Sequence, residues 1–511
     1  MARLAFKPDS SFFRKIAIGA VGTRAVAADL ERFGHRIAEL ERGSTDTKLW
    51  KEVKRKRVRI PDLVCLDCGI RIESRAKTQA DLSMSHSLAD DTRAWDFGMV
   101  DDDWIAFPVC EPTQERYWSA GRLTGGASYW HERNWVRWRT TGHINYFLVR
   151  AFRATPPSRR STKGVTEGSE TTVAWDATFS TRSGTVESAS SRRVTIRRVS
   201  DGHRYTRNIP PGQIVRVSSG DVVSENQALA SSVVPVHPET LTCNRSLDAT
   251  RLDRLISSRE RTQRFTGTKL ARLLRKTEFE RAVRRLTDDP EEDVYVRLEG
   301  ASYLASVCGE SIDRLFAPYY ESSDEQTQLE AVIATAEAAT PGAVSVLSSF
   351  LDATGKPYFL RSAAAWALGK IGTTNALSRL TGAFADVDHS IREEALEAIV
   401  SLGGPAIPSL LAGLRDTNEE IAAGCAESLR QQHRLPNEVV TDLLEELRST
   451  NPSLWTVWLA AHLPREQVAT GIASLQRSAP HLHYALALLW SFAQSWIARR
   501  WELSPHPEGA T

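Results

Sequence analysis

The sequence IPDLVCLDCGIRIESRAK, residues 60–77, contains the pattern that decides the fold of the N-terminal part of the chain. It predicts two short strands joined by a Cys-x-x-Cys knuckle, with Asp62 opening the first strand. Because side chains alternate faces along a strand, we expect Glu73, Arg75 and Lys77 on one face of the second strand. A metal-dependent phosphodiester-cleaving site needs two acids that hold Mg²⁺ and a cation that steadies the attacking water or the developing charge. The stretch therefore predicts a candidate catalytic site.

Length and composition indicate a protein of several domains. At 511 residues the chain is too long for one hydrophobic core, so we expect two to four domains. A composition of 41% hydrophobic and 25% charged residues is typical of a soluble globular protein. The N-terminus has no charged-then-apolar leader, and six cysteines are too few for a disulfide framework. We therefore expect a cytoplasmic protein with reduced thiols and no membrane partner.

Residues 1–115 predict a strand-rich α/β domain. Apolar residues at helical spacing predict a helix that ends at Gly34, and the apolar run from Trp104 to Val109 predicts a buried strand that ends at Cys110. Just before the knuckle, alternating apolar and basic residues predict a strand with a cationic outer face, formed by Lys54, Arg55, Lys56, Arg57 and Arg59. This face is either a solvated edge that discourages aggregation or a ridge that contacts phosphates.

Residues 116–245 predict a β-rich region. Trp135, Arg137 and Arg139 share one strand face, which suits either stacking and phosphate contact on nucleic acid or a sheet whose arginines are solvated. Residues 209–230 contain a Val-rich strand, a Gly220–Asp221 turn and a second strand ending in QALA. This segment resembles the barrel-sandwich hairpin of lipoyl- and biotinyl-like domains. Its tip carries no lysine, so the resemblance implies a small β-module and not a covalent carrier.

The rest of the chain predicts helices. Residues 246–290 form a basic helical connector, which either faces nucleic acid or acidic partners or lies in water. Similar helical segments then begin at Val296, Thr327, Leu360, Ile391 and Ile421, at intervals of about 30 residues. Each unit is a helix pair too small to bury its own apolar face, so the pairs must stack. We expect an α-solenoid over residues 291–436 and a Trp-rich helical cap over residues 437–505.

The repeats resemble HEAT-like repeats of the phycobilisome-lyase type, most clearly in LRSAAAWALGKIG, residues 360–372. The resemblance implies a scaffold that docks a protein partner. It does not imply lyase activity, because such arrays occur in many unrelated proteins.

The pattern Pro-Asp at residues 61–62, then Glu73 and Arg75, resembles the PD-(D/E)xK, or restriction-endonuclease-like, superfamily. The wider N-terminal block is similar to that of HEAT-repeat proteins carrying such a domain. The resemblance implies that Asp62 and Glu73 bind Mg²⁺ and that Glu39 or Glu41 is an upstream acid. Arg75 stands where the family has its catalytic Lys, and Arg cannot tune a water as a Lys can. Lys77, on the same face, is the residue that could substitute.

The knuckle also suggests zinc. Cys65 and Cys68 form half of a tetrahedral site, and Cys110 and His86 are the nearest candidates to complete it; the alternative is a reduced thiol pair. Taken together, the sequence predicts a multidomain α/β, β and α protein that binds nucleic acid, with or without Mg²⁺-dependent cleavage, and docks a protein on its HEAT array. The competing hypothesis is a non-enzymatic HEAT-repeat scaffold for protein–protein interaction.

Overall fold

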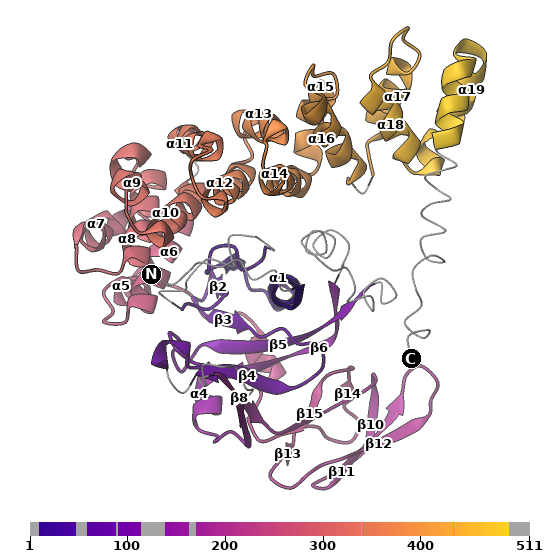
Figure 1. Cartoon of the computed structure of the whole chain (residues 1–511). Coiled ribbons are helices and arrows are strands. Elements are labelled where there is room, and N and C mark those ends of the chain that lie inside the picture. The colour runs from indigo at the N-terminus through magenta and orange to yellow at the C-terminus, as the bar shows by residue number, and fades with distance from the viewer. Residues whose placement is uncertain are drawn as a thin grey trace. The chain divides into compact units, whose positions relative to one another are not determined.

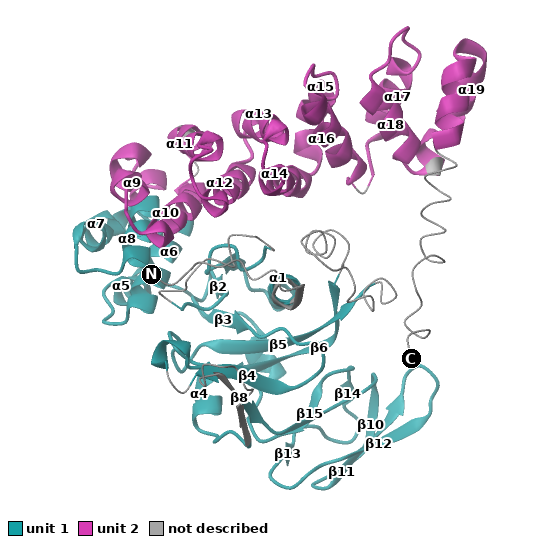
Figure 2. Ribbon diagram, in the orientation of Figure 1, with its two compact units in different colours: residues 1–303 teal, residues 304–511 magenta. Residues whose placement is uncertain are grey.

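The computed structural model describes residues 10–46, 59–87, 90–113, 138–162, 170–338, 340–432 and 434–489. The chain divides into two compact units, residues 1–303 and 304–511 (Figure 2). Each unit is described by itself below. The predicted basic strand lies outside the described residues except for Arg59, and so do Trp135 and Arg137.

The centre of the first unit is a five-stranded mixed sheet with the order β1-β2-β3-β5-β6 (Figure 1). Only the β3–β5 pair is parallel; the other neighbours are antiparallel. The strands are β1 (Ile37–Glu39), β2 (Leu63–Cys65), β3 (Arg71–Ser74), β5 (Trp104–Pro112) and β6 (Trp138–Leu148). Because β6 completes the sheet, the first domain extends beyond the predicted boundary at residue 115.

The sheet is the middle of three layers, and alternation along β5 decides what each face contacts. Trp104 and Ala106 point to helix α1 (Ser10–Glu31), which buries Val26 and Leu30 against them. Phe107, on the opposite face, packs with Ile105 in a core shared with a second sheet. That sheet has the order β4-β8-β7, formed by β4 (Leu82–Ser87), β8 (Glu170–Trp175) and β7 (Arg159–Thr162), and the short helix α4 (Val149–Arg153) joins the same core.

A small β-module follows. Its strands form two sheets, ordered β12-β11-β10-β14 and β13-β15-β9, around a core that includes Val194, Ile196 and Leu229. The strands are β9 (Ala177–Phe179), β10 (Gly184–Ser190), β11 (Arg193–Arg198), β12 (Arg204–Asn208), β13 (Ile214–Val215), β14 (Val222–Val223) and β15 (Ala228–Ser231). In the predicted hairpin of residues 209–230, β13 does pair with β15, but β14 between them pairs with β10 instead.

The chain then returns to the central sheet, where Val236 donates a backbone hydrogen bond to Tyr146 and Leu241 enters the core under α1. The predicted basic connector forms helices α5 (Ala249–Ile256), α6 (Arg261–Leu273) and α7 (Glu280–Asp288). Two of its cations are used inside the unit. Lys269 donates to the Leu40 carbonyl oxygen over 3.0 Å, and Arg272 lies 2.6 Å from the Glu299 carboxylate.

The rest of the described chain consists of helices, and those of unit 2 form a stack of helix pairs (Figure 1). The five predicted repeat starts all fall within helices α8, α10, α12, α14 and α16, so the predicted periodicity is confirmed. The helices are α8 (Val294–Ser306), α9 (Ile312–Tyr320), α10 (Glu325–Ala338), α11 (Pro341–Asp352), α12 (Tyr358–Ile371), α13 (Thr374–Gly382), α14 (His389–Leu402), α15 (Ile407–Gly413), α16 (Glu419–Arg430), α17 (Asn437–Glu446), α18 (Leu454–His462) and α19 (Arg465–Ser478). Within unit 2, α10, α12, α14, α16 and α18 contact one another in succession.

In the parts of the chain that the structure describes, no single helix is both long and apolar enough to cross a membrane. Residues 389–402 and 404–413 meet the length and composition required only as a pair bent by 114°.

Candidate functional site

The β2–β3 hairpin brings the two predicted acids together. Leu63 is paired with Ile72 in an antiparallel register, so Asp62, just before β2, lies opposite Glu73 on β3. One carboxylate oxygen of Asp62 accepts a hydrogen bond from the Ser74 backbone amide at 2.9 Å. The Glu73 side chain is only 12% exposed. The register thus brings the two backbone positions side by side, and a shared cation between their carboxylates stays a prediction.

The two cations of the predicted site are engaged by other groups. The Arg75 guanidinium lies 3.2 Å from the Glu73 carboxylate and donates to the Trp95 carbonyl oxygen. Lys77 donates to the Ser83 hydroxyl over 3.0 Å and lies 3.7 Å from the Asp81 carboxylate. Burial lowers the pKa of Lys77, and Asp81 partly offsets this. Arg75 thus supplies positive charge directly beside the acid pair, where it would compete with a bound Mg²⁺.

The upstream acids have their own surroundings. Glu39 accepts hydrogen bonds from the backbone amide and the hydroxyl of Thr45, at 2.8 and 2.9 Å, and so closes the turn that follows β1. Glu41 is buried. Mg²⁺ needs only one or two carboxylates, because it keeps several waters. Asp62 and Glu73 therefore suffice in number, without a contribution from Glu39.

The described members of the predicted nucleic-acid surface both make contacts within the protein. Arg59 donates to the Ala94 carbonyl oxygen over 3.2 Å, and burial lowers its pKa. Arg139, on β6, pairs with Glu111 on β5, and both side chains are largely exposed. Lys54, Arg55, Lys56 and Arg57 lie outside the described residues.

The knuckle cysteines belong to a cluster whose other two members differ from those the sequence suggests. Sulfur and nitrogen atoms of His35, Cys65, Cys68 and Cys243 all lie within 4.8 Å of one another, the one such group of ligand atoms in the described residues. Cys65 Sγ is 3.9 Å from Cys243 Sγ, and Cys68 Sγ is 3.6 Å from His35 Nδ1. A hydrogen bond between the two knuckle thiols lowers the pKa of Cys65 and raises that of Cys68.

Cys110 and His86 are placed elsewhere. Cys110 is buried with Ile18 and Trp138, and its sulfur lies 3.8 Å from the Ile18 carbonyl oxygen. His86 is on β4, where a ring nitrogen lies 3.4 Å from the Trp95 amide. His86 and Cys110 follow Cys68 by 18 and 42 residues. His35 precedes Cys65 by 30 residues and Cys243 follows Cys68 by 175, and neither belongs to a metal-binding motif with the knuckle.

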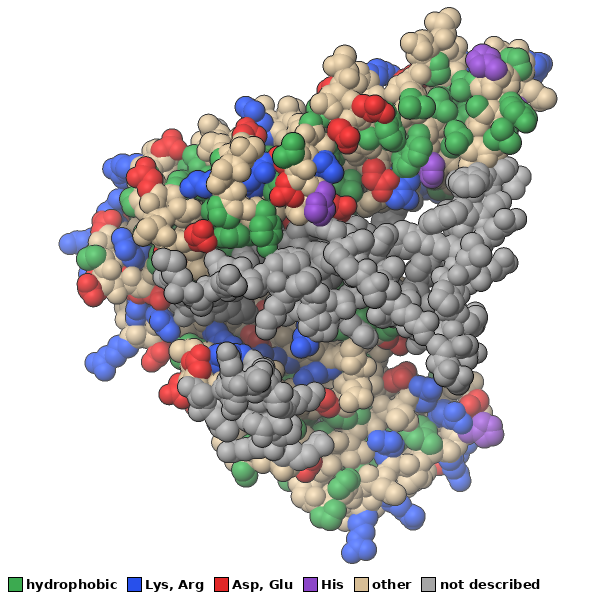
Figure 3. All heavy atoms as spheres, in the orientation of Figure 1, with side chains coloured by type: hydrophobic (Ala, Val, Ile, Leu, Met, Phe, Trp, Pro, Cys, Tyr) green, Lys and Arg blue, Asp and Glu red, His purple; other side chains and the backbone are tan. Residues whose placement is uncertain are grey.

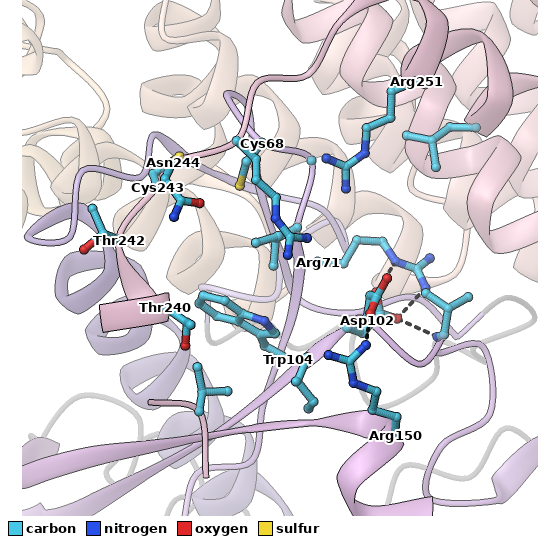
Figure 4. A pocket seen from close by; sticks show the side chains of 18 of the residues that line it. Cys68, Arg71, Asp102, Trp104, Arg150, Thr240, Thr242, Cys243, Asn244 and Arg251 are labelled. Carbon is cyan, nitrogen blue, oxygen red and sulfur yellow. Dashed lines mark hydrogen bonds and ion pairs between the residues drawn. The ribbon is translucent and has the colours of Figure 1, made fainter. Parts of the chain in front are cut away.

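A pocket of about 370 Å³ lies beside this cluster, with Cys68 and Cys243 in its wall (Figure 4). Four arginines line it: Arg71, Arg150, Arg245 and Arg251. Two of them are paired with acids, since Arg71 contacts Asp103 and Arg150 lies 2.7 Å from Asp102. The pocket is therefore polar and carries both signs of charge.

Comparison with known proteins identifies the helical part. The family described as HEAT repeats matches residues 312–400. No curated protein matches the chain. The match covers no part of the N-terminal sheet. It confirms the predicted HEAT repeats, which suit protein partners.

Several solved structures are similar over about half of the chain. YibA of Escherichia coli is 17% identical, covering 48% of this chain and 93% of that one, with a TM-score of 0.26. Human deoxyhypusine hydroxylase is 14% identical, covering 44% and 99%, with a TM-score of 0.20. The CpcE–CpcF complex of phycocyanin lyase from Nostoc is 14% identical, covering 49% and 96%, with a TM-score of 0.17. Because these TM-scores are low, the fold of this part rests on the family match and on the helix pairs themselves.

Proposed function

We propose that the protein is a non-enzymatic docking scaffold whose HEAT array binds a basic segment of a protein partner. The observation that carries the proposal is the charge of the array. Residues 304–511 contain 14 Lys and Arg against 24 Asp and Glu, whereas residues 1–303 contain 51 against 39. An array with this excess of acid repels nucleic acid and attracts basic peptide surfaces.

Part of this negative charge lines a groove between α14 and α16. It has a volume of about 240 Å³ and is lined by three acids, Glu393, Glu420 and Glu427. One arginine, Arg392, and His389 also line it, with Phe384 and Leu396 among its apolar residues. The long aliphatic stem of a Lys or Arg could pack on the apolar residues while its charged end meets the carboxylates. Such a combination favours a basic segment over a purely apolar one.

The array also offers apolar surface toward its C-terminal end. Figure 3 shows hydrophobic side chains gathered there, where Leu454, Tyr484 and Leu488 are each more than half exposed. A partner segment that is both basic and amphipathic would use both features.

The test uses the full chain and short fluorescent peptides. The fluorescence anisotropy of a basic amphipathic peptide of Lys and Leu should rise when the protein is added, and that of an acidic peptide of Glu and Leu should not. Added salt should weaken the binding, because these charges are near solvent. The double variant Glu393→Gln, Glu420→Gln should weaken it about threefold or more, while Glu438→Gln, an exposed change on α17, should not. Equal binding of both peptides, or no effect of the double variant, would exclude this function.

A second candidate function is nucleic-acid binding by the first unit. It is favoured by the excess of basic residues in residues 1–303 and by the opposed positions of Asp62 and Glu73 in the β2–β3 register. Binding to labelled DNA or RNA should fall steeply with salt. If the protein cleaves nucleic acid in Mg²⁺ or Mn²⁺ and Glu73→Gln abolishes the cleavage, Asp62 and Glu73 form a catalytic site. Binding without cleavage would agree with the presence of Arg75 where the PD-(D/E)xK superfamily has its catalytic Lys. The absence of both would remove this candidate.

A further inference from the structure

The cluster of His35, Cys65, Cys68 and Cys243 has the dimensions of a zinc site. Zinc binds thiolate sulfur at about 2.3 Å and imidazole nitrogen at about 2.0–2.1 Å in tetrahedral geometry. Those bond lengths place two sulfur ligands about 3.8 Å apart and a sulfur and a nitrogen about 3.6 Å apart. The observed separations are 3.9 Å between the sulfurs of Cys65 and Cys243, and 3.6 Å between Cys68 Sγ and His35 Nδ1.

The histidine is oriented for this role by a contact on its far side. His35 Nε2 lies 2.7 Å from the Leu241 carbonyl oxygen. A carbonyl oxygen only accepts, so Nε2 carries the proton and the lone pair of Nδ1 points into the cluster. Metal-binding histidines are usually held in this way by a backbone carbonyl or a carboxylate. Trp104 packs against the same ring in a T-shaped arrangement, with 5.7 Å between ring centroids.

Backbone hydrogen bonds help to bring the ligands together. In the knuckle, the Gly69 amide donates to the Cys65 carbonyl oxygen at 2.9 Å, and Gly69 has a φ of +69°, a conformation that favours glycine. The Leu247 amide donates to the Asp67 carbonyl oxygen at 2.6 Å, and the Cys243 amide donates to the Phe33 carbonyl oxygen at 3.0 Å. The segment that carries Cys243 is thus docked on the knuckle and on the end of α1.

We propose that His35, Cys65, Cys68 and Cys243 bind one Zn²⁺ ion, and that this ion ties residues 241–247 to the β2–β3 hairpin. Four protein ligands fill the tetrahedron and leave no position for water or substrate, which is the arrangement of a structural and not a catalytic zinc site. The proposal does not depend on the function of the HEAT array. It would also fix the part of the pocket wall formed by Cys68 and Cys243.

The first measurement is the metal content of the full chain, purified without chelators. We expect one zinc per chain by elemental analysis, released when a mercurial reagent modifies the thiols. Replacement by Co²⁺ should give the visible ligand-field bands of a tetrahedral thiolate site and a sulfur-to-cobalt charge-transfer band. The unmodified protein thus tests the proposal even if a variant fails to fold.

Variants then assign the ligands. Cys243→Ser and His35→Asn should each lower the zinc content and alter the Co²⁺ spectrum, because each removes one ligand. Cys308→Ser, in the second unit, and Cys110→Ser should keep one zinc per chain. A folded protein without zinc after reconstitution, a disulfide between Cys65 and Cys243, or zinc content unchanged in Cys243→Ser would each overturn the proposal.

Discussion

The most stringent test of the fold of the first unit is the substitution Glu299→Gln. Glu299 is fully buried and pairs with both Arg42 and Arg272, whose side chains are 2% and 7% exposed. The three residues join the turn after β1 to α6 and α8, far apart in sequence. Glutamine keeps the size of the side chain but removes the only charge that Glu299 contributes, so two guanidinium groups stay buried beside a neutral amide.

The expected cost follows from the burial of these charges. Removing one partner of a buried ion pair typically destabilises a protein by about 3–5 kcal/mol. An unfolding entropy of about 2.1 cal/mol/K per residue gives about 0.6 kcal/mol/K for the 303 residues of this unit. A loss of about 4 kcal/mol therefore predicts a fall in Tm of about 6 °C.

The assay is calorimetry of the full chain, with the transition of the first unit identified by the fluorescence of its buried tryptophans. The control is Glu278→Gln, because Glu278 is half exposed and lies 3.9 Å from Lys276; it should cost less than about 0.5 kcal/mol. A triple change of Arg42, Glu299 and Arg272 to apolar residues should recover most of the loss, as hydrophobic replacement of a buried ion cluster often does. A Glu299→Gln variant as stable as the Glu278→Gln control would refute this account of the interior.

Two further predictions concern the same unit. Burial lowers the pKa of His143 in the folded protein. As the pH falls below about 6.5, the His143 imidazole is therefore protonated in the unfolded chain before it is protonated in the folded one, and the free energy of unfolding declines until the pH reaches the lower folded pKa. His143→Gln should flatten that part of a plot of Tm against pH. A variant with an unchanged slope would show that other groups cause it. Gly98→Ala should cost more than about 2 kcal/mol, because φ is +78° and the added Cβ would lie 1.9 Å from the Arg59 carbonyl oxygen. Gly202→Ala, with φ +69° and no atom within 4 Å of the new Cβ, should cost only about 1 kcal/mol in urea titrations; equal losses for the two glycines would contradict the close approach at Gly98.

The helical half was predictable because its signal is local and repeated. The periodic segments at Val296, Leu360 and Ile391 each begin in a helix, and the HEAT match spans two of them. The β2–β3 hairpin was predictable for a similar reason, since both of its strands lie within residues 60–77, on either side of the Cys-x-x-Cys knuckle. A pattern confined to one helix or hairpin needs no knowledge of what packs against it.

The partners of the knuckle could not be predicted, because they arrive from distant parts of the chain. Neither His35 nor Cys243 belongs to a motif, and only the return of residues 235–247 to the central sheet brings Cys243 to the cluster. The same limit applies to the basic connector. Its charge pattern cannot tell that Lys269 and Arg272 are buried while Arg275 and Lys276 are exposed.

The return of residues 235–247 to the central sheet also affects how the protein folds during synthesis. The last strand of the central sheet ends at Leu148, but Leu241, Lys269 and Glu299 pack on this region about 100–150 residues later. At a synthesis rate of about 5–20 residues per second, a ribosome leaves the sheet without this cover for roughly 8–30 s. We expect the part of this core that Leu241 completes to be accessible to chaperones during that interval, and a chain released near residue 150 would lack Leu241. The first unit is therefore expected to mature only after residue 299 has left the ribosome.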